Sequence, residues 1–296
     1  MQIRATTTDS LYLQIDAKQK KQELDLEKDT ISLQEEASFS TTNFSITDND
    51  SGNSKQIPLT TQFVKEVMKV HNSAGAMSLK VHQKLKEGTL TLEEYRAFLG
   101  VYLLVYTALE RAVSRFQFDP SIAAIVTPEV MAVLAKKDDL IKALSDSGVQ
   151  SPVEYAQQFY DGALVTFTEH CDKIDDARDL LPMCYVIFSG HFNGGPNLRS
   201  YVASLIENHW EGQGSNAFYT LSQSEMLAVD SVKERALEIK ERSPDRDMYW
   251  CTVKAYQGYF KNLVNSLPID QEDCFYMEGK AEEAFLLLCS CLAVLN

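Results

Sequence analysis

The stretch LLPMCYVIFSGHFNGGPNLRS, residues 180–200, has the pattern of a buried helix that glycines interrupt. Its apolar residues recur every three or four positions, which is the spacing of one helix face. Three glycines then fall within residues 190–195, and each costs a helix interior about 0.5–1 kcal/mol relative to alanine. Pro196 lacks a backbone N–H, so we expect a kink there. Either the bare backbone lets a ligand approach closely, or the helix crosses another helix tightly or ends at Asn193.

Composition and charge argue against several classes of partner. The chain has 296 residues, 45% of them hydrophobic, and a net charge of −14. This charge disfavours binding to nucleic acid or to an anionic membrane surface, since both reward basic patches. The longest apolar run, residues 284–295, is too short to span a bilayer, so we expect no integral membrane segment. No secretory signal opens the sequence and no CxxC pair is present, which indicates a cytoplasmic protein with reduced cysteines.

The first 58 residues differ in composition from the rest of the chain. They are rich in Thr, Ser, Asp, Gln and Lys and show little sustained hydrophobic period. Such a composition buries too little apolar surface to offset the entropy of ordering the chain. We therefore predict a polar, disordered or weakly structured extension over residues 1–58, followed by one helical domain over residues 59–296.

From residue 60 onward the hydrophobic pattern has the period of helices. Gly88 closes the first predicted helix, and Thr91 with Glu94 forms a capping box ahead of the second, which runs to about residue 116. No segment alternates with period two for long enough to form a sheet, so we expect an all-α, multi-helix bundle. Further helices are expected over residues 127–145, 151–173, 175–208, 222–241, 249–267 and 271–295.

The histidines are the candidate metal ligands. His71 lies on the apolar face of the first helix, where a neutral imidazole can ligate iron, although a lone buried histidine is more often a hydrogen-bonded core residue. His82 follows eleven residues later, roughly 16 Å along the axis, so the two cannot share one metal. No metalloprotease, dinucleotide-binding, P-loop or di-iron motif is present. A histidine-bearing helix beside a glycine-opened helix suits a flat ligand, and haem fits that description.

Four segments, taken in order, resemble the haem oxygenases, the all-α enzymes that open haem to biliverdin. The resemblance covers about residues 60–296 and depends on the order and spacing of the segments together. The segments are Val70-His71 with Lys86-Glu87-Gly88 downstream, YTALE at 106–110, YVIFSGHFNGG at 185–195, and NSL at 265–267 with AFLL at 284–287.

This resemblance implies a haem site and a reaction. His71 is implied as the proximal iron ligand, and Gly190 and Gly194 as the distal positions whose bare backbone lets haem and dioxygen sit close. Haem would be both substrate and cofactor, and its oxidative cleavage would release biliverdin, carbon monoxide and ferrous iron. The electrons would come from an external donor, either a ferredoxin or a flavin reductase.

The resemblance also implies contacts to the two haem propionates. Tyr185 and Lys261 fall where such contacts lie in the family, and a cation there offsets propionate charge. The basic pair that the family carries just before the proximal histidine is represented only approximately, by Lys65 and Lys69. Gln257 stands where another propionate-pairing lysine is expected. These departures weaken the predicted haem site without removing it.

His191 is the departure that bears most on activity. Many members of the family carry an aspartate directly after the distal glycine, where it orders water. A histidine can also order water, so His191 is counted among the predicted catalytic residues, but it could instead bind the iron and block dioxygen. The sequence therefore predicts a haem oxygenase first. The alternatives are a non-catalytic haem carrier or sensor, a helical interaction protein that has lost haem, and a thiamin-degrading relative with Cys184 as its catalytic cysteine.

Overall fold

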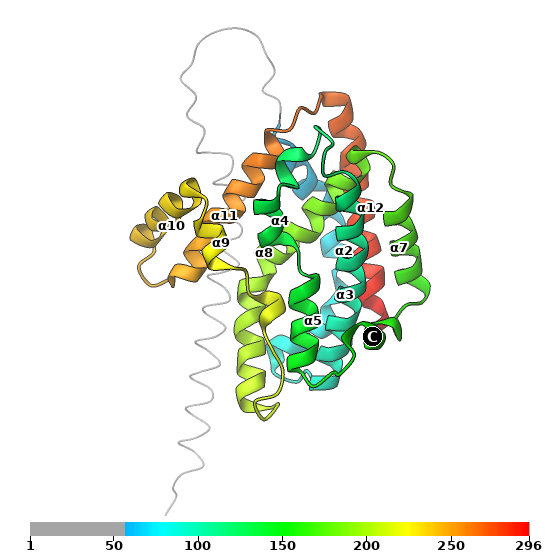
Figure 1. Cartoon of the computed structure of the whole chain (residues 1–296), viewed down its shortest axis with the longest axis vertical. Helices are drawn as coiled ribbons and strands as arrows, with labels where there is room; N and C mark the ends of the chain where they lie inside the picture. Colours follow the sequence, from blue (N-terminus) through cyan, green and yellow to red (C-terminus); the bar gives the residue numbers. More distant parts are fainter. Residues whose placement is uncertain (1–56, 296) are drawn as a thin grey trace, which may run out of the picture. The chain divides into compact units, whose positions relative to one another are not determined.

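Every regular element in the described part of the chain is a helix (Figure 1). The computed structural model describes residues 57–295, except for the side chains at 71–79, 197, 271 and 294. No strand occurs within these residues, so the all-α prediction is confirmed. The α-helices are α2 (Leu59–Glu87), α3 (Leu92–Arg115), α4 (Pro128–Leu134), α5 (Lys137–Asp146), α6 (Pro152–Gln157), α7 (Gly162–Lys173), α8 (Ala177–Asn208), α9 (Gln223–Leu227), α10 (Asp230–Arg242), α11 (Met248–Asn265) and α12 (Gln271–Leu292), with short 3-10 helices η1 (Ala123–Ile125), η2 (Ala217–Tyr219) and η3 (Ala293–Leu295).

The ends of α2 and the start of α3 follow the predicted capping pattern. Pro58 stands at the N-cap of α2, and residues 1–56 of the predicted extension lie outside the described part. Gly88 ends α2 with a φ of 69°, a left-handed conformation that glycine adopts without steric cost. The Thr91 hydroxyl accepts the Glu94 amide N–H, and the Glu94 carboxylate accepts the Thr91 amide N–H, which is the capping box expected there.

α3 is the core helix that the sequence predicted. Thirteen of its 24 residues are buried, and it packs against α5, α6 and α7. Its length and apolar composition alone would suffice for a membrane span, and it is the one helix among the described residues of which this holds. In this fold, 67% of its most apolar window is buried inside the protein, which is the environment of a core helix.

α8 is one continuous helix of 32 residues that runs through both Pro182 and Pro196. The alternative in which this helix ends at Asn193 is therefore wrong. An interior proline removes one backbone hydrogen bond and crowds the preceding turn. Around the first proline, residues 180–189 are all buried, so extensive packing offsets this loss.

Three neighbours hold α8 in place. α2 and α8 both pack along α12, and α11 contacts both α2 and α8 (Figure 1). The contact between α8 and α11 is aromatic, because the Phe192 ring centroid lies 5.6 Å from that of Tyr256 and 5.8 Å from that of Phe260. These aromatic pairs fix α11 against the glycine-containing part of α8.

Three segments that were predicted as single helices are broken in two. Residues 127–145 form α4 and α5, and residues 151–173 form α6 and α7, with Gly162 at a φ of 39° where α7 begins. Residues 222–241 form α9 and α10, which Figure 1 shows beside α11. α10 is largely exposed, as expected, and only Val232 and Ala236 in it are buried.

Candidate functional site

α2 and α8 run side by side in the same direction and contact each other near both ends. At the N-terminal end, the ring centroids of Phe63 on α2 and Tyr185 on α8 lie 5.4 Å apart. Just beyond the C-terminal ends of the two helices, the Trp210 indole N–H donates to the Leu90 carbonyl oxygen at 3.1 Å. Two nearly parallel helices fixed in this way have a common register along their length.

This register places His71 level with the glycines of α8. His71 follows Phe63 by eight residues, or ~12 Å along the axis at ~1.5 Å per residue. Gly190 and Gly194 follow Tyr185 by five and nine residues, or ~7.5 Å and ~13.5 Å. The position of His71 therefore lies opposite the stretch between the two glycines. The His71 side chain lies outside the described part, so its role as a ligand stays a prediction.

The glycines of α8 do not all face the same surroundings. A Cβ added at Gly190 would meet no atom of the described residues within 4 Å, and one at Gly194 would meet only the Leu198 side chain at 3.7 Å. A Cβ at Gly195 would lie 3.7 Å from the His191 ring and 3.8 Å from a carbonyl oxygen of η2. Gly190 and Gly194 thus expose bare backbone, whereas Gly195 allows η2 to pack closely.

His191 lies against η2, on a different side of α8 from Gly190. Its ring centroid is 4.9 Å from that of Phe218 and 6.2 Å from that of Tyr219. Its Nε2 atom is buried and has no hydrogen-bond partner among the described residues. Burial, reinforced by the positive charge of Lys136, holds the pKa of His191 well below its usual value of 6.5, although a hydrogen bond with the Phe218 backbone opposes this shift. The imidazole is therefore neutral at physiological pH.

A polar cluster lies close to His191 and joins α3 to α5. The Lys136 ammonium donates to the Asp139 carboxylate at 2.6 Å and to the Thr220 carbonyl oxygen at 3.1 Å. One Glu110 carboxylate oxygen accepts the amide N–H groups of Lys136 at 2.7 Å and Lys137 at 3.0 Å. Burial raises the pKa of Glu110 despite these two bonds. Glu110 therefore satisfies backbone groups at the start of α5, a role that its place in the YTALE segment did not reveal.

One face of α11 spans the edge between α8 and α2. The Gln257 side-chain amide donates to the Asn193 carboxamide oxygen on α8. Two turns later, the Asn265 carboxamide oxygen accepts the Thr60 amide N–H at the start of α2, at 3.0 Å. Lys261 stands four residues from each of these contacts, so it shares their face of α11. Lys261 is therefore placed on the face of α11 that bonds to both α8 and α2.

Comparison with known proteins agrees with this arrangement of helices. The model of the family described as "Heme oxygenase" matches residues 58–292, which is most of the chain. The chain belongs to the haem oxygenase family. A curated relative, heme oxygenase 1 from Synechocystis sp., is 21% identical over 202 residues, which cover 68% of this chain and 70% of the relative.

Solved haem oxygenase structures share the fold. The crystal structure of the Synechocystis heme oxygenase-1 in complex with heme has a TM-score of 0.60 and 19% identity, and the match covers 81% of this chain and 93% of the other. The heme oxygenase from Leptospira interrogans has a TM-score of 0.61 and 19% identity, with 80% of this chain and 100% of the other covered. At these identities the likeness establishes the fold of this haem oxygenase family member.

Tyr185, which the sequence predicts as a propionate contact in this chain, has a buried hydroxyl. Its ring is stacked on that of Phe260, with 6.4 Å between the centroids. The hydroxyl has no hydrogen-bond partner of good geometry among the described residues. Burial raises the pKa of Tyr185 to about 12, and the nearby side chains of Ser189 and Thr60 oppose the rise. A buried donor without a partner is a group that a ligand oxygen can satisfy.

The two lysines predicted near the propionates lie further round α2. Lys69 is bonded to Glu66 at 2.6 Å, and this bond, together with the charges of Glu278 and Glu282 on α12, raises the Lys69 pKa. Lys69 therefore faces α12 and not the space next to α8. Lys65 is exposed and lies one residue from Val64, ~100° further round α2, so neither lysine shares the side of α2 that carries position 71.

Val64 and Met68 share a side of α2 with the position of His71, because they precede it by seven and three residues. Both side chains are apolar and about half exposed. The spacing of seven and three residues before His71 is the sequence signal that could have placed Val64 and Met68 at the candidate site.

The cysteine that a thiamin-degrading relative would need does not have the environment of a nucleophile. Cys184 is fully buried in the core, and burial raises the pKa of its thiol. A reactive cysteine needs the opposite, a lowered pKa and access to substrate. Nor do the described residues hold any cluster of three or more His, Cys, Asp or Glu side chains suited to a metal. A site with one protein ligand to a haem iron does not require such a cluster.

Proposed function

We propose that this protein binds haem between α2 and α8 and cleaves it with dioxygen to biliverdin, carbon monoxide and ferrous iron. One observation carries this proposal: the bare backbone at Gly190 and Gly194 lies level with the position of His71, in a register fixed at both ends of the two helices. That arrangement leaves room for a flat ligand held by one imidazole.

Each predicted residue has a separate task in this site. His71 holds the iron from α2, and the glycines of α8 allow the ring and dioxygen to approach the opposite backbone. The unpartnered Tyr185 hydroxyl and the Lys261 ammonium bind a propionate carboxylate at the edge. Haem, when bound, supplies the iron that activates dioxygen and the carbon skeleton that is cut.

The position of His191 favours the oxygenase over the haem carrier or sensor. A carrier with two axial histidines would need the His191 ring to reach the iron. Its ring instead packs against Phe218 and Tyr219 of η2, and a Cβ added at Gly195 would lie 3.7 Å from the same ring. His191 contributes a neutral imidazole behind the distal backbone, where its free Nε2 can hold a water. This arrangement leaves the dioxygen position unblocked.

The remaining parts of the function follow from the chemistry of the reaction. An external electron donor, a ferredoxin or a flavin reductase, is required because the chain carries no redox motif of its own. The reaction in a cytoplasmic setting fits the acidic chain with its buried free cysteines.

An absorbance titration of the full chain with haem, followed by a reductant under air, tests the proposal. We expect a saturable Soret band that decays to the broad absorption of biliverdin when ascorbate or a ferredoxin system is added. Haem that binds with low-spin bands and is not degraded would favour the carrier or sensor. Absence of a Soret band would contradict the proposal and leave the helical interaction protein as the explanation.

A further inference from the structure

α2 and α11 meet along one edge of the proposed haem site, and we call this edge the mouth. Thr60 of α2 bonds to Asn265 of α11, and α11 runs from there back toward Asn193 of α8. The two helices are therefore antiparallel along this edge. One turn from the Thr60–Asn265 contact, Val64 on α2 comes level with Lys261 on α11.

The α2 side of this mouth is apolar and open to solvent. Val64 is 44% exposed and Met68 is 45% exposed, and they stand one turn apart on the side of α2 that carries position 71. The two lysines of this part of α2 do not share that side, because each residue rotates by ~100° around the helix. Lys69 is also held by Glu66 and faces the acidic residues of α12.

The α11 side supplies a cation and a neutral amide. Lys261 brings the positive charge, and Gln257, one turn earlier on the same face, donates to Asn193 of α8. Among the described side chains named at this mouth, Lys261 is the one that can neutralise a carboxylate. A second carboxylate placed against Val64 and Met68 would gain no ion pair and would stay in water.

We propose that the mouth recognises a tetrapyrrole by hydrocarbon contact on the α2 side and by one ion pair, to Lys261, on the α11 side. Val64 and Met68 are thus specificity-determining residues, and one of the two carboxylates of haem contributes nothing to binding. The flexible thioether of Met68 suits a ring edge of variable shape. This inference rests on the proposed function, since it concerns which haem-like ligands the same site accepts.

Titration of the full chain with haem and with its dimethyl ester, which lacks both carboxylate charges, tests this inference. Soret absorbance and quenching of tryptophan fluorescence both report the dissociation constant, in one buffer with the same detergent. We expect the ester to bind within tenfold of haem, because only one ion pair is lost. A dissociation constant for the ester more than tenfold higher would overturn the inference.

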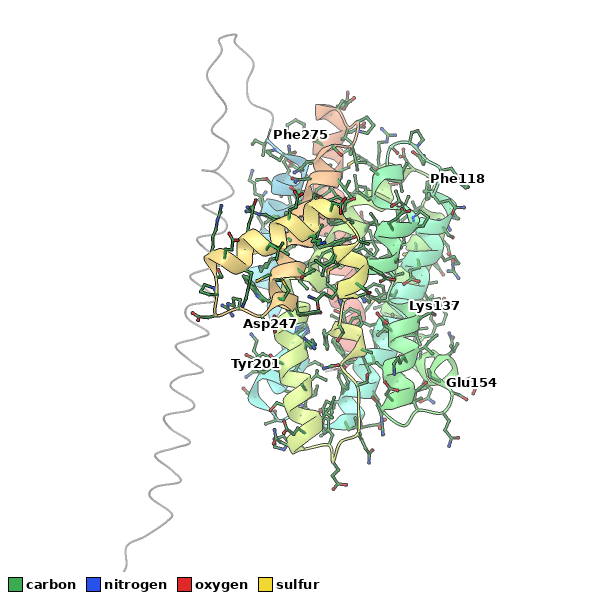
Figure 2. The ribbon with its side chains drawn as sticks, turned by 60° about the vertical axis from the view of Figure 1, so that its left-hand side comes forward. Phe118, Lys137, Glu154, Tyr201, Asp247 and Phe275 are labelled. Atoms are coloured by element: carbon green, nitrogen blue, oxygen red, sulfur yellow. The ribbon has the colours of Figure 1, made fainter. Side chains whose placement is uncertain are left out.

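Two added cations on α2 provide a gain-of-affinity test. The double variant Val64→Lys/Met68→Lys should bind haem at least tenfold more tightly, because the second carboxylate gains a partner, and should bind the ester no more tightly. The matched control is Phe275→Lys/Leu286→Lys, which makes the same charge change at exposed apolar side chains of α12; Phe275, 64% exposed, is labelled in Figure 2. Unchanged haem affinity in the α2 variant, or an equal gain in the control, would contradict the inference.

Lys261→Met completes the test from the α11 side. It should weaken haem binding and leave ester binding unchanged, with circular dichroism confirming an intact helical fold. Equal losses for the two ligands would contradict the role of Lys261 as the carboxylate partner. A wild-type chain that gives no Soret band with either ligand contradicts the proposed function itself, whereas bands with strong discrimination against the ester contradict this inference alone.

Discussion

The imidazole of His191 on α8 lies nearly parallel to the phenol ring of Tyr219 on η2, with 6.2 Å between the centroids and 9° between the planes. This pairing places the residue after Gly190 against η2. The buried ring must stay neutral, because a charged imidazolium there would be desolvated and would face the ammonium of Lys136. The stability of the protein therefore depends on the neutrality of this imidazole.

The stability of the protein should fall in mild acid because of His191. The unfolded chain binds a proton at the usual pKa near 6.5, whereas the folded pKa lies well below it. The stabilisation is therefore fully present above pH 6.5 and is lost as pH falls toward the folded pKa. The free energy of unfolding should therefore be lower at pH 5.5 than at pH 7.5. Urea unfolding of the wild type and of His191→Phe measures this, and an equal pH dependence in both would rule out His191 as its source.

The variant His191→Phe should leave the absorbance spectrum of bound haem unchanged. The phenyl ring keeps the contacts with Phe218 and Tyr219 and removes both nitrogens, so any iron coordination by His191 would be lost. We expect identical Soret positions and spin-state bands in the wild type and in His191→Phe. Conversion of a low-spin wild-type spectrum to a high-spin one would show that His191 ligates the iron.

A large side chain at Gly194 should exclude haem without unfolding the protein. A Cβ there meets only the Leu198 side chain at 3.7 Å, so the variant Gly194→Leu fits its helix locally. Loss of a helical glycine should even stabilise the fold by about 0.5–1 kcal/mol. In Gly194→Leu, the haem affinity measured by titration should therefore fall, whereas the midpoint of thermal unfolding should rise. Gly279→Leu on α12 is the control, because an added Cβ at Gly279 meets no described atom within 4 Å. This control should bind haem with the wild-type affinity. Tight haem binding by Gly194→Leu would contradict the site.

Removal of the imidazole at position 71 should abolish the normal Soret spectrum while circular dichroism stays helical. His82→Ala is the matched control, because His82 lies on the same helix and packs edge-on against Phe98 with 5.9 Å between centroids. That variant should lose some stability and keep the spectrum. If His71→Ala kept the wild-type spectrum, the assignment of His71 as the iron ligand would be wrong.

Glu110 should matter as a hydrogen-bond acceptor and not as a charge. Its carboxylate accepts the amide N–H groups of Lys136 and Lys137, and burial already disfavours its ionised form. Glu110→Gln keeps an acceptor and should unfold near the wild-type denaturant concentration. Glu110→Ala leaves two amides without that partner and should cost about 1–3 kcal/mol. Equal losses of unfolding free energy in Glu110→Gln and Glu110→Ala would show that the negative charge of Glu110 stabilises the fold, and not its role as an acceptor.

The helical fold could be predicted from the sequence because its signals are local. The glycine at residue 88, the capping box at Thr91 and the apolar length of α3 each depend on a few neighbouring residues, and the structure confirms all three. The breaks within residues 127–145, 151–173 and 222–241 were missed, because each half keeps a helical period and only tertiary packing decides where the chain turns. The family assignment, made from the order of four short segments, is confirmed by the family match.

The candidate site was only partly predictable, since side-chain direction depends on neighbours far away in sequence. The roles that the resemblance implied for Gly190 and Lys261 stay predictions, and the structure adds only that a Cβ at Gly190 would meet no described atom within 4 Å. Helical rotation alone places Lys69 ~200° from His71 around α2, so its direction was readable from the sequence. The attraction of Lys69 by two glutamates of α12 was hidden, because these glutamates lie more than 200 residues away in sequence. The enclosure of His191 by η2 was equally hidden, since η2 follows it by more than 25 residues.

The two walls of the site, α2 and α8, touch at their ends and are separated by about 120 residues of sequence at the level of His71 and Gly190. A molecule bound between them therefore acts as a non-covalent cross-link that closes a very long loop of the chain. By mass action, such a ligand at 100 times its dissociation constant adds about 2.7 kcal/mol to the free energy of unfolding. The amount of correctly folded protein in a cell would then rise and fall with the supply of that ligand.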